Sequence, residues 1–322
     1  MSRTLPGSTL DWLLDSDAAV RWQVLRDLAG APAEDVEAER RRVAASGWGA
    51  RLLSLQGADG QWDGGTYWPS EDTSDGHTHE SDGQPWTATT YSLLLLRDFG
   101  VDPHDERVRC AISLVRDNSR WEEGNQPFFK GETEPCINGM AVALGAYFGE
   151  RVDGIVERLA GEQLDDGGWN CEAERGSTRS SFHSTICVLE GLLGYEDASG
   201  GTAASRAARK RGEEYLLDRR LMRRKSTGEV VSPDFLQFSY PTRWFYDVLR
   251  GLDYFRATGA APDGRLAEAV ELVRSKQQPD GTWFLEDTHA GKTHFPLEDG
   301  DGKPSRWNTL RAFRVLRWYE GS

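Results

Sequence analysis

The sequence lacks an excess of basic residues, and it lacks any long run of apolar residues. Its 322 residues include 38 Lys and Arg against 52 Asp and Glu, which gives a formal net charge of −14. Such a surface repels the phosphates of nucleic acids and of anionic lipids, which excludes both as main partners. The longest leucine run, 93–96, is too short to span a bilayer, and residues 1–10 contain no apolar segment of a signal peptide. We therefore expect a cytoplasmic protein without stable membrane insertion.

Cysteines and strand patterns are also scarce. The four cysteines stand at positions 110, 136, 171 and 187. In a cytoplasmic chain of this length we expect reduced thiols that serve as small buried groups or as ligands, not disulfides. The alternation of apolar and polar residues that is typical of half-buried strands is nearly absent, whereas helical periodicity recurs. The sequence therefore predicts an all-α protein.

One stretch departs from the acidic composition. Between residues 206 and 225, basic side chains gather in the groups 209–211, 219–220 and 223–225. A solvated face of an outer helix explains such a run, and the attraction of an anionic substrate is the alternative. Both interpretations stay open at this stage.

Three similar turns, each closed by a tryptophan, mark an internal repeat. In each of them a Gln precedes the Trp by six residues and a Gly precedes it by two. Trp62 and Trp169 lie 107 positions apart (169 − 62), and Trp169 and Trp283 lie 114 apart (283 − 169). A degraded copy that ends at Trp121 divides the first interval. The repeat unit is therefore about fifty residues long, which is the size of a helical hairpin with its loops.

Two kinds of helical segment alternate along these repeats. A helix that is apolar on all sides must be buried on all sides, whereas a one-sided helix lies at the surface. We expect buried helices at 87–99, 137–148, 184–193, 244–255 and 307–318, and surface helices at 33–55, 105–116, 152–162, 203–218 and 266–276. With an incomplete first hairpin at 12–28, this predicts an α/α toroid of about six hairpins, an inner ring of helices wrapped by an outer ring, as a single domain over residues 1–322. The inner helices would run parallel and begin at one mouth of the barrel.

The Gln, Gly and Trp turns resemble those of the terpenoid cyclase and protein prenyltransferase superfamily, which includes squalene cyclase-like proteins and prenyltransferase β-subunits. The resemblance runs from 21–28 through 306–310. It implies the toroid fold and an isoprenoid-like substrate, but many chemistries use this fold, so the function depends on the site.

One residue of each predicted inner helix falls at the same position near the mouth. These residues are Trp86, Cys136, His183, Arg243 and Arg306. Cys136 and His183 lie 47 residues apart (183 − 136), which is one repeat and predicts neighbouring positions. Cys171 follows the turn of Trp169 and leads into the helix of His183. Two thiolates and one imidazole are the ligands of a tetrahedral zinc site with one open position. The alternative is that the cysteines are small buried residues and His183 caps its helix.

The residues around Cys136 resemble the zinc motif of prenyltransferase β-subunits. The stretch 129–136 is similar to their carboxylate-x-Cys motif, and 167–185 is similar to their next repeat, where the corresponding histidine is a zinc ligand. That family has Asp where this chain has Glu134, and it has a carboxylate near the position of Cys171. The resemblance therefore implies that Glu134 is a fourth ligand or a general base, while an exposed charge at a helix start remains the alternative.

Aromatic and arginine side chains are predicted to gather near the same mouth. Around an apolar cavity they would bind a hydrophobic or isoprenoid-like substrate, although each aromatic residue alone is also typical of a core. The aromatic candidates are Trp86, Phe129, Phe182, Tyr240, Trp244 and Trp307. Arg243 and Arg306 would hold a phosphate or carboxylate group of the substrate, or would pair with acids such as Asp234 and Asp247.

Two motifs of terpene chemistry are missing. The sequence contains neither the Asp-x-Asp-Asp acid of class II cyclases nor the Asp-rich metal motif of class I synthases. The leading hypothesis is a zinc-dependent enzyme that activates a thiol or water against an apolar substrate, with alkyl or prenyl transfer as the subtype that the resemblance implies. A metal-free isomerase with Glu134 as its acid is a second hypothesis. The third is a non-catalytic toroid that binds a lipid or a protein. The sequence does not identify a protein partner.

Overall fold

A computed structural model describes residues 6–70 and 84–321 of the chain. It is helical apart from one short antiparallel pair among the described residues, β1 (Trp283–Phe284) with β2 (Pro304–Ser305). The predicted all-α class is confirmed, and the alternation of buried and surface helices is the one expected for an α/α toroid. Across the part of the chain that the structure describes, no helix combines the length and the apolar character needed to cross a membrane.

The chain divides into two compact units. Unit 1 comprises the described parts of Met1–Arg40, Leu216–His289 and Pro296–Ser322, and unit 2 comprises Arg41–Tyr215 and Ala290–Phe295. Each unit contains helices of both predicted kinds. The expectation of one domain over residues 1–322 stays a prediction.

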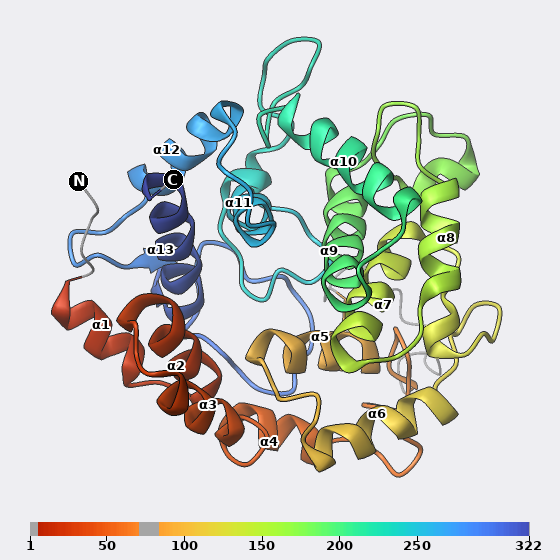
Figure 1. Cartoon of the computed structure of the whole chain (residues 1–322), viewed down its shortest axis with the longest axis horizontal. Helices are drawn as coiled ribbons and strands as arrows, with labels where there is room; N and C mark the ends of the chain where they lie inside the picture. Colours follow the sequence, from red (N-terminus) through yellow and green to blue (C-terminus); the bar gives the residue numbers. More distant parts are fainter. Residues whose placement is uncertain (1–5, 71–83, 322) are drawn as a thin grey trace. The chain divides into compact units, whose positions relative to one another are not determined.

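The helices of unit 2 are those expected from the sequence. The inner helices, which are buried along most of their length, are α5 (Thr89–Phe99), α7 (Pro135–Phe148) and α9 (Phe182–Ser199). The outer helices are α4 (Gly47–Ser54), α6 (Glu106–Asn118), α8 (Asp153–Gly161) and α10 (Ala203–Leu217), whose last two residues lie in unit 1. The buried residues of α6, namely Val108, Ala111, Ile112 and Val115, follow the helical period and define its single inner face. α7 and α9 lie side by side (Figure 1).

Unit 1 holds the two ends of the chain. It contains α1 (Gly7–Leu14), α2 (Ala18–Val24), a π-helix (Leu25–Ala29), most of α3 (Ala33–Arg42), α11 (Val248–Ala257), α12 (Ala267–Ser275) and α13 (Arg306–Glu320). The buried helices α11 and α13 pack against each other, and α12 contacts both. α13 also contacts α2 and the π-helix that follows it, so the last helix packs against the N-terminal segment of this unit.

Two of the predicted helices have different boundaries. The outer helix expected at 33–55 is two helices, because Ser46 is extended and Gly47 has a φ of 70°, which interrupts the helix between α3 and α4. The inner helix expected to start at Trp244 starts at Val248 instead. Arg243 has a φ of 55°, and the Asp247 carboxylate accepts the Arg250 backbone N–H at 2.7 Å, which caps the helix at that point.

Each complete tryptophan turn ties an outer helix to the inner helix that follows it. The Trp169 indole N–H donates to the carbonyl of Leu159 at 2.7 Å, in the last turn of α8, where helix carbonyls have no partner within the helix. Its backbone N–H donates to the Thr185 hydroxyl at 3.1 Å, in the first turn of α9. The same two bonds recur at Trp62 with Leu52 and Thr89, and at Trp283 with Val273 and Thr309.

The glycine and glutamine of the Trp169 turn connect its repeat to the next. Gly167 has a φ of 99°, and a Cβ there would lie 2.7 Å from the carbonyl oxygen of Arg211 in α10. The Gln163 amide donates to Gly167 and, at 2.7 Å, to the Ala208 carbonyl in the same helix. The degraded copy differs as the sequence predicts, because the Trp121 indole donates to Phe128 inside its own loop. The repeated turn therefore makes tertiary contacts in addition to reversing the chain locally.

Trp169→Phe removes the indole N–H and leaves the buried Leu159 carbonyl without its donor. We expect the free energy of unfolding to fall by about 2 kcal/mol or more, because an unsatisfied buried acceptor costs about 1–3 kcal/mol and the smaller ring leaves a void. Chemical denaturation would measure the change. Trp318→Phe is the matched control, since that indole donates to the Ala260 carbonyl at an exposed position, and its effect should stay within about 0.5 kcal/mol. Equal losses in the two variants would contradict the role given to the turn.

Candidate metal centre

Two glycines bring α7 and α9 into backbone contact. A Cβ on Gly139 would lie 2.5 Å from the carbonyl group of Cys187, and one on Gly191 would lie 2.4 Å from the Gly139 carbonyl oxygen. No side chain fits at such distances, so only glycine allows this approach. The contacts follow the same order along both helices, from Gly139 with Cys187 near the start of this pair to Ala146 with Gly194 further along. Because the residue numbers rise together in the two helices, the helices run parallel, with their N-termini side by side.

The candidate metal centre lies at these N-termini. Cys136 is buried in the first turn of α7, directly after Pro135, and Glu134 is the residue that precedes the helix. Cys171 begins a short 3-10 helix (Cys171–Arg175) in the loop that leads to α9. The two Sγ atoms are 3.0 Å apart, and the Cys136 Sγ lies 3.4 Å from a Glu134 carboxylate oxygen. Within 6–70 and 84–321, these three are the only His, Cys, Asp or Glu side chains whose ligand atoms gather as a trio within 4.8 Å of one another.

The backbone before Cys136 is braced by a buried acid and an amide. A Glu132 carboxylate oxygen accepts the backbone N–H of Glu134 at 2.6 Å. Asn138 exchanges two hydrogen bonds of 2.8 Å with the backbone of Glu132. The Arg158 guanidinium donates to the Glu132 carbonyl at 2.6 Å. These bonds hold Glu134 and Cys136 in place, as supporting contacts do around metal ligands.

The two cysteines form a thiol pair and not a disulfide. Their Sγ separation of 3.0 Å is well above the S–S bond length of about 2.05 Å. The hydrogen bond between the two thiols and then burial raise the pKa of the Cys136 thiol well above its usual value, and the nearby charges of Cys171, Cys187 and Glu134 act in the same direction. Placing several negative groups together in a buried site disfavours ionisation unless a cation is bound among them. Two sulfur ligands and one carboxylate oxygen are a donor set that zinc accepts.

His183 is not one of the three clustered side chains. It is a partly exposed residue at the start of α9, between Phe182 and Ser184. The sequence spacing of 47 had placed His183 beside Cys136, whereas in the structure the neighbouring Ser184 lies against the cysteine pair. One residue turns a helix by about 100°, which directs the two side chains differently. The Ser184 hydroxyl lies 3.3 Å from the Cys171 Sγ. The role of His183 as a ligand stays a prediction.

Two tyrosines near Cys136 were missed by the sequence analysis. Tyr67 and Tyr91 have ring centroids 5.2 Å apart, and the Gln84 amide donates to the Tyr91 hydroxyl at 2.6 Å. Burial raises the pKa of both phenols, and the negative charge of Cys136 raises them further. Tyr67 lies in the loop after the first tryptophan turn, which carries no motif of its own. Only the folded loop places this phenol near the cysteines.

Three of the predicted aromatic residues lie in unit 2. Trp86 is 2% exposed, packs edge-on against Tyr91 and donates its indole N–H to the Ala290 carbonyl at 2.9 Å. Phe129 and Phe182 are also buried. Phe129 packs in the 3-10 helix (Phe128–Lys130) that precedes Glu134, and Phe182 precedes His183. Buried aromatic residues therefore lie in the chain segments next to the cluster residues.

The other predicted site residues lie in unit 1. Tyr240 and Trp307 stack with centroids 4.5 Å apart, and Trp244 stacks on Phe245 at 3.7 Å. Arg243 is buried in the loop before α11. Arg306 begins α13 as predicted, but its guanidinium lies over the Trp12 ring at 4.7 Å and donates to two carbonyls of the first hairpin. Asp247, the acid considered as a partner for these arginines, instead accepts from Ser239 and caps α11.

Among known proteins, the chain is similar to solved structures and to no family model or curated protein. The chain is similar to the apo structure of the type II terpene cyclase MstE from Scytonema, at 16% sequence identity and a TM-score of 0.41, over 93% of this chain and 86% of that chain. Membership of the superfamily that the sequence motifs resemble stays a prediction.

Gly139→Ala tests whether close helix contact positions the centre. A Cβ at this position meets the backbone of α9, so α7 and α9 must separate, and we expect a loss of about 1–3 kcal/mol in the free energy of unfolding. Gly154→Ala in α8 is the matched control, because a Cβ there meets no atom within 4 Å and should be neutral or gain up to about 1 kcal/mol. Thermal denaturation would measure both variants. Equal melting temperatures for Gly139→Ala and the native protein would show that the two helices are not held in contact.

Proposed function

We propose that Glu134, Cys136 and Cys171 bind a zinc ion and that the protein is a zinc-dependent enzyme. The observation that carries this proposal is the position of the three ligand atoms, all within 4.8 Å of one another at the N-termini of two parallel helices. Three protein ligands leave one of four tetrahedral positions open, which is typical of catalytic zinc sites. His183, at the start of α9, is the remaining candidate for a ligand.

The chain's own residues provide a site in which a charged nucleophile is stabilised. The thiols must lose their protons when a cation binds, and the Glu134 carboxylate, 3.4 Å from the Cys136 Sγ, is placed to accept one of them. If Glu134 is not a ligand, the same carboxylate would act as a general base toward the reacting group. When bound, zinc would lower the pKa of a thiol or water molecule and make it nucleophilic.

The substrate that we propose is apolar and isoprenoid-like. The buried aromatic residues Trp86, Tyr91, Phe129 and Phe182, together with the half-buried Tyr67, support an apolar partner. Carbon–sulfur bond formation by alkyl or prenyl transfer is the reaction type that the sequence resemblance implies. Arg243 and Arg306 would orient an anionic group of the substrate, which for Arg306 requires release of its contacts to Trp12 and Asp15.

Metal analysis of the purified full chain tests the proposal directly. After equilibration with zinc and removal of the excess, we expect close to one zinc per chain for the native protein and close to none for Cys136→Ala, Cys171→Ala and Glu134→Gln. Cys110→Ala is the matched control, because this exposed thiol on α6 stands outside the cluster and its loss should leave the zinc content unchanged. His183→Ala decides whether the histidine is a ligand, since zinc loss would make it one.

A folded native protein that takes up no zinc would overturn the proposal. Circular dichroism on each variant would separate the loss of a ligand from the loss of the fold. Activity that survives exhaustive chelation but is lost in Glu134→Gln would favour a metal-free isomerase with Glu134 as its acid. A bound lipid or protein released unchanged from the purified chain would favour a non-catalytic toroid.

A further inference from the structure

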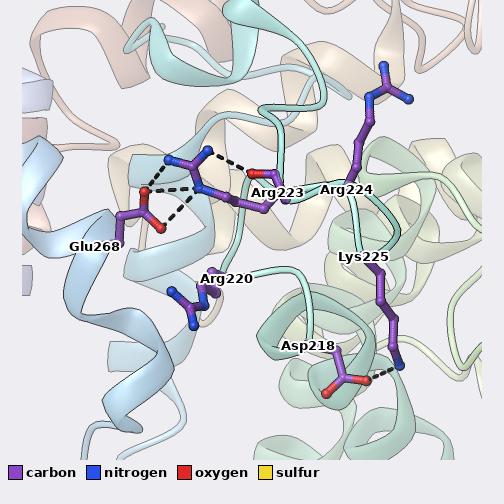
Figure 2. A pocket seen from close by; sticks show the side chains of 7 residues that line it. Asp218, Arg220, Arg223, Arg224, Lys225 and Glu268 are labelled. Carbon is purple, nitrogen blue, oxygen red and sulfur yellow. Dashed lines mark hydrogen bonds and ion pairs between the residues drawn. The ribbon is translucent and has the colours of Figure 1, made fainter.

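A positively charged groove lies in unit 1, formed by residues that the zinc proposal does not use. It has a volume of about 670 Å³, within the range of small-molecule sites. The groove is lined by the segment that follows α10 and by the first turn of α12, and its lining residues are Asp218, Arg220, Arg223, Arg224, Lys225, Gly228 and Glu268. Figure 2 shows Arg223 reaching toward Glu268 and Lys225 toward Asp218.

Positive charge is in excess among these side chains. Four cations face two carboxylates, although the whole chain carries a net charge of −14. One guanidinium edge of Arg223, formed by Nε and Nη2, bonds to Glu268, with Nε 3.0 and 3.1 Å from the two carboxylate oxygens. The Arg223 Nη1 donates to the Gly228 carbonyl at 2.8 Å, and Lys225 pairs with Asp218 at 2.6 Å. Arg220 forms no ion pair with any carboxylate of the described residues, and its side chain is exposed. The groove therefore keeps a cation that its own acids do not neutralise.

Glu268 marks the position where the groove stabilises an anion. The hydrogen bonds from Arg223 lower the pKa of its carboxyl group, and the charges of Arg223 and Arg220 lower it further. A carboxylate in the field of two guanidinium groups occupies the kind of position that a phosphate oxygen takes, because the planar fork of arginine matches both groups. Arg224 points away from Glu268 in Figure 2, and its guanidinium donates to the Val231 carbonyl at 3.0 Å.

The backbone of this segment is held firmly, so the arginines are presented from a fixed turn. Leu221 and Met222 are buried between the two arginines, and the Tyr246 hydroxyl donates to the Leu221 carbonyl at 2.6 Å. Arg220 and Leu221 both have positive φ, 46° and 64°, a conformation that only strong surrounding contacts maintain in such residues. The backbone N–H groups of 219–223 already donate to the carbonyls of Leu216, Leu217 and Arg219, so the side chains remain as hydrogen-bond donors for a ligand.

We propose that this groove binds a phosphate dianion. Arg220 and Arg223 hold the dianion, and Arg223 gives up part of its contact with Glu268 to do so. A dianion satisfies both guanidinium groups, whereas Glu268 supplies a single charge that is mainly bound to Arg223. The volume leaves room for an organic group attached to the phosphate. The proposal is independent of the zinc centre, which belongs to unit 2.

Calorimetric titration of the full chain with phenyl phosphate, at low ionic strength in a phosphate-free buffer, tests the groove. We expect saturable binding that Arg220→Gln weakens about tenfold or more, because each hydrogen bond to a charged group contributes about 1.5–3 kcal/mol. Arg109→Gln is the matched control, since this exposed arginine on α6 changes the net charge equally and does not line the groove. Its affinity should equal that of the native protein. Phenyl sulfate, which carries one charge fewer, should bind more weakly.

A second variant is expected to change the affinity in the opposite direction. Glu268→Gln removes the carboxylate that competes for Arg223, so phenyl phosphate should bind more tightly by about tenfold. A parallel titration with inorganic phosphate identifies the source of the ligand, since equal affinity indicates a free phosphate ion and weaker affinity indicates an organic monoester. Absence of binding, equal affinities in Arg220→Gln and Arg109→Gln, or weaker binding in a folded Glu268→Gln variant would each overturn the proposal.

Discussion

The tryptophan turn is the constraint on which the rest of the structure depends. One indole N–H binds a carbonyl in the last turn of an outer helix, and the backbone N–H of the same residue binds a threonine near the start of the next inner helix. Trp169 does this between Leu159 and Thr185. Buried hydrogen-bonding groups must be satisfied, and here one residue satisfies two such groups while filling the space between the helices. The outer and inner helices that each turn joins are therefore held together within their unit, and the loops between them start from anchored helix ends.

The candidate metal centre follows from that arrangement and from close helix contact. Gly139 and Gly191 let α7 and α9 touch through their backbones, so the helix N-termini come together with a definite register. Cys136 belongs to one of these N-termini, and Cys171 belongs to the loop that leads into the other. A side chain at either glycine would separate the helices. The chemistry at the cysteines therefore depends on glycines that contain no reactive group.

The charged groove depends on a tight turn and not on contact between two helices. Its arginines follow the end of an outer helix, where buried Leu221 and Met222 anchor a turn with two positive φ angles. The excess of positive charge stands out because the chain as a whole is strongly acidic. In the sequence the same arginines are part of a longer basic run, and periodicity alone assigns such a run to a solvated helix face. The turn after α10 removes Arg220 and Arg223 from that face and directs them toward α12.

Composition and periodicity determined the all-α class, the repeat and most helix boundaries, because burial on one side or on all sides leaves a direct pattern in the sequence. Periodicity also related Cys136, Cys171 and His183, while Glu134 was implied by the resemblance to the prenyltransferase zinc motif. Where the pattern is interrupted by backbone geometry, as at Gly47 and before Val248, the boundaries were wrong, since a positive φ or a capping carboxylate leaves little periodic signal. The register between α7 and α9 was decided only by tertiary structure. Backbone contact at Gly139 and Gly191 determines how the two helices lie against each other, and Ser184, the residue after His183, lies against the cysteine pair.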